Sequence, residues 1–83
     1  MKIDILIKPK EDCTYIERIL KTAATSLNIP VQISKGSNFS AFPNLSVNFS
    51  QTPIVVINGN AEFVGKNLDI QAVKKKLAEI NAH

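Results

Sequence analysis

The chain has 83 residues, a hydrophobic content of 45% and a formal net charge of +3 at pH 7. This length gives room for one core, so we expect a single domain over residues 1–83. The charge is too small to indicate nucleic-acid binding, and no apolar run approaches the length of a membrane helix, so neither partner is expected. One cysteine cannot form an intrachain disulfide, and the acidic N-terminal stretch does not fit a signal peptide, which favours a cytoplasmic location.

The first half of the chain predicts a strand, a helix and a second strand. Apolar and polar residues alternate over residues 2–7, and Pro9 ends this strand because it lacks an amide donor. A helix follows, and Pro30 marks its end. The apolar residues with the 3–4 spacing of a helix face are Ile16, Ile19, Leu20, Ala23 and Leu27. A short strand is then predicted over residues 31–34.

The start of the first helix has two candidate caps. Thr14 and Glu17 have the spacing of a capping box, whereas Asp12 would cap the helix two residues earlier. The choice decides whether Cys13 lies inside the first turn or just ahead of it.

The segment from residue 35 to residue 52 is rich in Ser, Asn and Phe, and its secondary structure stays open. Phe42, Leu45 and Phe49 fit one face of a helix, whereas Leu45, Val47 and Phe49 fit the alternation of a strand. Because it carries three of the four phenylalanines, we expect it to pack rather than to act as a linker.

The last third predicts a hairpin and a helix. Residues 54–57, IVVI, are typical of a central strand, and Asn58-Gly59 is a strong hairpin signal that leads into a return strand over residues 61–64. Asn67 or Asp69 is expected to cap the final helix. Its apolar positions are Ile70, Val73, Leu77 and Ile80. The whole order predicts a four-stranded mixed sheet with helices packed on it.

Three stretches together resemble the thioredoxin fold: the turn KPKEDC before the first helix, the stretch QTPIVVINGNAEFVG, and the lysine-rich last helix. The chain is most similar to the small archaeal and bacterial glutaredoxin-like proteins called redox-active disulfide proteins. The resemblance implies a minimal thioredoxin-like α/β fold of the order βαβ(α)ββα. It also implies a cis peptide bond at Thr52-Pro53, facing the position of the active-site sulfurs.

The Cys-x-x-Cys motif of that family falls on Lys10-Glu11-Asp12-Cys13, so a lysine replaces the first cysteine. A lone sulfur cannot close an intramolecular disulfide, which excludes the ordinary dithiol cycle. The resemblance therefore implies a thiol–disulfide redox protein with one active-site cysteine, Cys13, acting by a monothiol mechanism. The alternative is a non-catalytic protein- or peptide-binding module, and whether the chain is an enzyme stays open.

Two interpretations of Cys13 remain: a reactive thiol, favoured by the helix N-terminus with Lys8 and Lys10 as nearby cations, or a small buried hydrophobic residue. Lys10 is a candidate anion anchor or a solvated turn residue. Thr52 and Pro53 are candidates for backbone contacts to an extended substrate, as in the family.

The expected partners are a thiol-containing protein, a peptide or glutathione, and we expect a monomer. No cofactor is predicted, with glutathione as the one small molecule that the resemblance suggests. Tyr15 is assigned to the core edge in preference to the site. His83 is the only histidine and has no evident partner, so no metal site is predicted.

Overall fold

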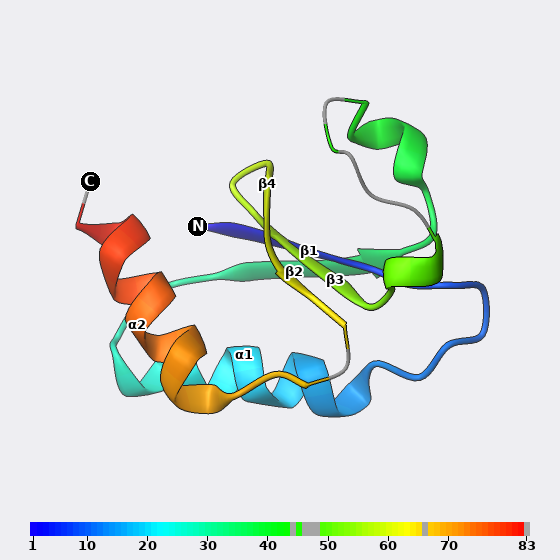
Figure 1. Cartoon of the computed structure of the whole chain (residues 1–83). Coiled ribbons are helices and arrows are strands. Elements are labelled where there is room, and N and C mark those ends of the chain that lie inside the picture. The colour runs from blue at the N-terminus through cyan, green and yellow to red at the C-terminus, as the bar shows by residue number, and fades with distance from the viewer. Residues whose placement is uncertain (44, 46–48, 66, 83) are drawn as a thin grey trace.

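The computed structural model describes residues 1–43, 45, 49–65 and 67–82 (Figure 1). Its elements are β1 (Lys2–Leu6), α1 (Thr14–Ser26), β2 (Gln32–Gly36), the 3-10 helices η1 (Phe39–Ala41) and η2 (Phe49–Gln51), β3 (Ile54–Ile57), β4 (Asn60–Val64) and α2 (Ile70–Asn81). The predictions that involve Val47 and His83 fall outside the described residues.

The four strands form one mixed sheet in the order β2-β1-β3-β4. β1 pairs with β2 in parallel, while the β1–β3 and β3–β4 pairs are antiparallel. This is the predicted mixed sheet, with IVVI in a central strand that is buried along its whole length. Figure 1 shows α1 and α2 on the same side of the sheet, where they pack against each other.

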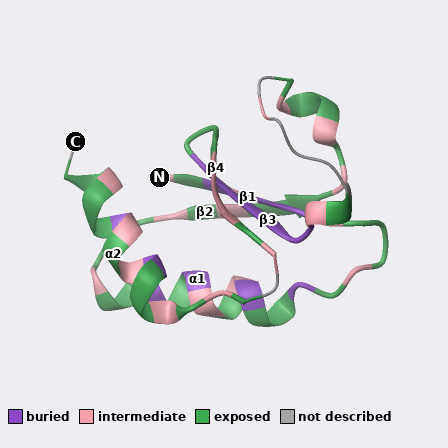
Figure 2. Ribbon diagram, in the orientation of Figure 1, coloured by how far each residue is buried: buried purple, intermediate pink, exposed green. Residues whose placement is uncertain are grey.

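The main core lies between this face of the sheet and the two helices (Figure 2). Alternate strand residues point into it because side chains along a strand have a period of two. Its most deeply buried members include Ile3, Ile5, Val55 and Ile57 from the strands, Ile16, Leu20 and Ala23 from α1, and Val73 and Leu77 from α2. The helix residues in this list share one face each, as the 3–4 spacing predicted.

A second, smaller cluster covers the opposite face of the sheet. There Leu6, Ile54 and Val56 are buried. Phe39, Phe42 and Leu45 pack against them from the segment between β2 and β3. Over its described residues this segment forms the two 3-10 helices. Both alternatives considered from the sequence, the helix and the strand, run through residues outside the described ranges.

The hairpin and the last helix begin as their local signals predict. Asn58 and Gly59 both have positive φ, 51° and 87°, which is the conformation of a type I′ hairpin turn. Asp69, rather than Asn67, is the N-cap of α2, and its Oδ2 accepts a hydrogen bond from the Ala72 amide at 3.1 Å. No helix among the described residues combines the length and the apolar character needed to cross a membrane.

Candidate functional site

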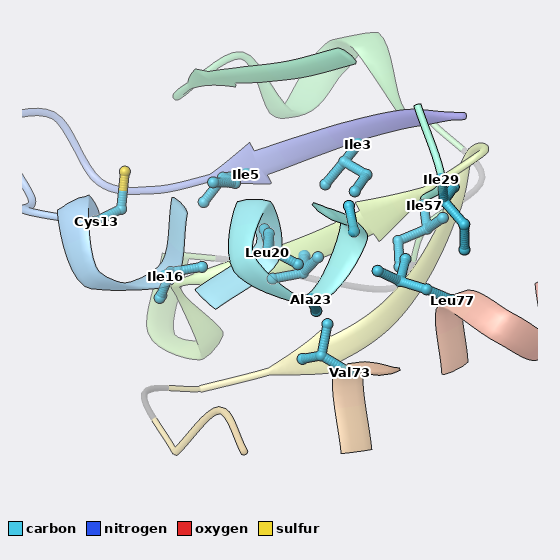
Figure 3. Close-up of a cluster of buried hydrophobic side chains, with 12 residues drawn as sticks. Ile3, Ile5, Cys13, Ile16, Leu20, Ala23, Ile29, Ile57, Val73 and Leu77 are labelled. Carbon is cyan, nitrogen blue, oxygen red and sulfur yellow. The ribbon is translucent and has the colours of Figure 1, made fainter. Parts of the chain in front are cut away.

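Cys13 occupies the N-cap position of α1, immediately before the first helical residue. Its side chain is 3% exposed and is part of the same buried cluster as Ile5 and Ile16. Figure 3 shows it at the end of that cluster, where α1 begins. The thiol is free, as it must be in a chain with one cysteine. The position therefore combines a helix N-terminus with burial at the end of the apolar core.

The surroundings of Cys13 raise the pKa of its thiol above the ordinary value. The largest cause is desolvation by burial, and the nearby carboxylates, Glu17 foremost, act in the same direction. Lys35 is the cation whose charge opposes this shift. Together these effects favour the neutral thiol over the thiolate that thiol–disulfide exchange requires.

Lys35 was missed from the sequence, which pointed instead to Lys8 and Lys10. Lys35 is on β2, in register with Ile5 of β1. The parallel pairing of β1 and β2 therefore brings it to the end of the sheet where α1 begins. Its ammonium lies 3.1 Å from the Glu17 carboxylate, whose other oxygen is 3.0 Å from Lys21. Only the strand register, and no local spacing, could have revealed this neighbour.

Neither candidate cap predicted from the sequence is the N-cap of α1, which is Cys13, although Asp12 does bond to the first helical residue. The Asp12 Oδ1 accepts hydrogen bonds from the Thr14 amide at 2.9 Å and from the Thr14 hydroxyl at 2.7 Å. These bonds lower the pKa of Asp12 because they favour its charged form. The Glu17 carboxylate faces Lys21 and Lys35, so no capping box organises this end. Because α1 begins at Thr14 and Cys13 is its N-cap, Cys13 lies just ahead of the first turn.

A tight turn precedes the helix and carries Lys10 on the surface. The Glu11 amide donates to the Lys8 carbonyl at 3.0 Å, and the Lys8 amide donates to the Glu11 Oε1 at 2.8 Å. Lys10 has φ of 68°, so together with Pro9 it has the pattern of a type II turn. Its side chain is exposed. The role of Lys10 as an anion anchor stays a prediction.

Thr52 and Pro53 form the bend that enters β3. Their peptide bond is cis, and both residues are buried, with Thr52 7% exposed. The Pro53 carbonyl accepts a hydrogen bond from the Gly65 amide at 2.9 Å, which joins this bend to the end of β4. Proline has no amide hydrogen, so this bond engages the one polar backbone group of Pro53. Backbone contacts from Thr52 and Pro53 to an extended substrate stay a prediction.

Pro53 meets the start of α1 at a surface pocket. The residues that line this pocket, which we call the Pro53 pocket, are Glu11, Asp12, Tyr15 and Pro53. The fold thus brings the proline bend to the residues on either side of Cys13, while Cys13 itself is buried in the main core and does not line the pocket. Lys10 lies in the turn just before this pocket.

The prediction that Tyr15 covers the core edge in preference to the site is wrong. Tyr15 is 41% exposed. The face of α1 that packs on the sheet carries Ile16 and Leu20, and Tyr15 lies beside that face. Val64 is the other exposed large hydrophobic residue described, at 52%, and it pairs with Ile54, directly after Pro53. The two exposed large apolar side chains therefore both lie near the proline bend.

Within the described ranges, no three His, Cys, Asp or Glu side chains gather closely enough to hold a metal ion. Neither the curated proteins nor the solved structures gave a significant match to the chain. A family model described as a thioredoxin domain matches residues 1–78. This match, together with the four-stranded mixed sheet and the two helices on one face of it, shows that the chain belongs to the thioredoxin-domain family.

Proposed function

We propose that this thioredoxin-domain protein is a non-catalytic module that binds extended peptide segments at the Pro53 pocket. The observation that carries the proposal is that Cys13 is 3% exposed, whereas its sequence neighbours Glu11, Asp12 and Tyr15 line a surface pocket together with Pro53. A module of this kind retains the binding surface of the fold and has lost the redox step.

Three features support peptide docking at this place. The pocket contains an exposed aromatic ring, that of Tyr15, and such rings are favoured anchors at protein interfaces. Val64 adds a second exposed apolar side chain near the bend. Thr52 precedes the proline, and by likeness to the family its backbone would pair with the ligand as with an added strand.

A monothiol exchange reaction is the second candidate, because Lys35 favours the thiolate of Cys13. In that reaction the Cys13 thiolate attacks one sulfur of glutathione disulfide or of a protein disulfide. A mixed disulfide forms at Cys13, and the other sulfur leaves as a thiolate that takes a proton from water. The reaction requires the thiol both to ionise and to reach the surface, and burial opposes both steps.

The reactivity of Cys13 separates the two candidates. We expect iodoacetamide to modify the folded protein far more slowly than the protein in urea, and glutathione disulfide to leave the folded protein unmodified by mass spectrometry. Rapid formation of a glutathione adduct on the folded protein at neutral pH would instead establish the monothiol reaction. The Cys13→Ala variant is the control for adducts at other groups.

Binding itself is tested by panning the Cys13→Ala protein against a random linear-peptide phage library. Peptides that bind this protein should bind about tenfold more weakly to a form that also carries Tyr15→Ala, since loss of a buried aromatic anchor costs at least this much. Thr22→Ala, at an exposed position of α1 outside the pocket, is the matched control. The proposal fails if Tyr15→Ala binds every selected peptide as tightly as the parent does.

A further inference from the structure

Resting on the proposed function, we infer that the Pro53 pocket selects a peptide that carries a Lys or Arg side chain. The pocket is lined by two carboxylates, Glu11 and Asp12, together with the ring of Tyr15 and Pro53. A long side chain with an apolar stem and a cationic end matches these walls, because the stem can lie along Tyr15 and Pro53 while the charge meets the carboxylates.

The Asp12 carboxylate is held in place and kept ionised. Its hydrogen bonds come from the amide and the hydroxyl of Thr14, which are uncharged donors, so they orient the carboxylate without neutralising it. The same bonds hold its pKa below the ordinary value, so the negative charge persists throughout the neutral pH range. Glu11 is oriented in a similar way by the Lys8 amide, at 2.8 Å.

Tyr15 adds a contact that favours a cation over a neutral residue. Its side chain is 41% exposed and lines the same pocket. An ammonium or guanidinium group over an aromatic face gains electrostatic attraction, which at exposed sites amounts to a several-fold change in affinity.

The cations of α1 and β2 do not line the Pro53 pocket. Thr14, Glu17, Arg18, Lys21 and Lys35 line a separate pocket, in which Lys21 and Lys35 are both paired with Glu17. Lys35 still acts on Asp12, because its charge helps to lower the pKa of that carboxyl, and Lys8 and Lys10 stand in the exposed turn that leads to Glu11. The chain as a whole carries +3, so the attraction for a cationic ligand is local and acts within about 8 Å at physiological salt.

The experiment uses peptides from the library selection, synthesised with their basic residues intact or replaced by norleucine. We expect the selected sequences to be enriched in Lys and Arg, and the norleucine versions to bind about 5- to 20-fold more weakly, as the loss of an ion pair and a cation–π contact implies. The double variant Glu11→Gln/Asp12→Asn should bind the basic and norleucine peptides alike. Glu62→Gln/Glu79→Gln, which removes two carboxylates that pair with Lys76 instead, is the matched control and should retain the preference.

The outcomes separate this inference from the function on which it rests. If Tyr15→Ala abolishes binding but neither norleucine nor Glu11→Gln/Asp12→Asn changes it, the pocket binds peptides without charge selection and the inference is overturned. If Tyr15→Ala leaves binding unchanged, the peptides bind elsewhere and the proposed function itself fails.

Discussion

Lys35 of β2 and Glu17 of α1 form an ion pair, with 3.1 Å between the Nζ and Oε2 atoms, and both charges act on the thiol of Cys13. They act in opposite directions, since the ammonium favours the thiolate and the carboxylate disfavours it. The pair also joins the edge strand to the first helix. Substitutions in this ion pair can therefore change the pKa of the Cys13 thiol without altering the core.

Substitutions in this pair should move the pKa of Cys13 in opposite directions. Lys35→Met removes the cation and is expected to raise it further, whereas Glu17→Gln is expected to lower it, because the carboxylate is lost and Lys35 is released from its partner. The measurement is the rate of Cys13 alkylation against pH. Lys74→Met and Glu79→Gln, both on α2, are the controls, and a shift of the same sign in both test variants would contradict this account.

The buried thiol should also make stability depend on pH in the alkaline range. The pKa of Cys13 is raised in the folded protein, whereas in the unfolded chain the thiol ionises near its ordinary value of about 8.5. Between these two values the folded state holds more protons, so the free energy of unfolding falls as pH rises, and below about pH 8 the contribution is constant. Urea denaturation of the wild type and of Cys13→Ala should therefore diverge in slope only above about pH 8. Parallel curves through pH 10 would show that the thiol ionises equally in both states.

The cap of α2 provides a test with a matched control. Asp69→Ala removes the acceptor for the Ala72 amide and should lower the free energy of unfolding by about 1 kcal/mol. Asn67→Ala, two residues earlier and exposed, should change it by less than about 0.5 kcal/mol. Urea denaturation at neutral pH gives both values, and equal effects would show that Asp69 is not the cap.

Lys10 has a backbone conformation that favours glycine. At φ of 68° a residue with a side chain destabilises the folded state by roughly 1–2 kcal/mol relative to glycine. Part of the gain from a glycine is offset, because glycine has more conformational freedom in the unfolded chain. Lys10→Gly should therefore raise the free energy of unfolding by about 0.5–1 kcal/mol. Lys10→Ala removes the same charge without relieving the backbone and should not stabilise, so a gain from Lys10→Ala as well would assign the effect to charge.

Much of the fold is determined by local patterns, and these could be predicted. IVVI became the buried central strand, Asn58-Gly59 became the hairpin turn, and the helices began within a residue or two of their expected caps. In each case the signal lies within a few residues of the structure that it specifies, as a period, a turn dipeptide or a capping side chain.

The rest depends on contacts between distant segments. Phe39 and Phe42, from the segment between β2 and β3, pack on Leu6 and its buried neighbours, and no local period encodes this contact. Likewise, the charge that acts on Cys13 comes from Lys35, which reaches it through strand pairing. The position of Cys13 in the family motif could be predicted, whereas its burial required the packed structure.

The register of β4 against β3 shifts by one residue between Val55 and Val56, so that Glu62 has no opposite residue. Such a bulge twists an edge strand and interrupts the regular row of donors and acceptors that a second chain would need to extend the sheet. Glu62 also places a carboxylate at this edge, 3.9 Å from the Lys76 ammonium. The outer edge of β4 is therefore a poor template for strand pairing with a second chain. This disfavours aggregation of a small, apolar-rich chain at high concentration.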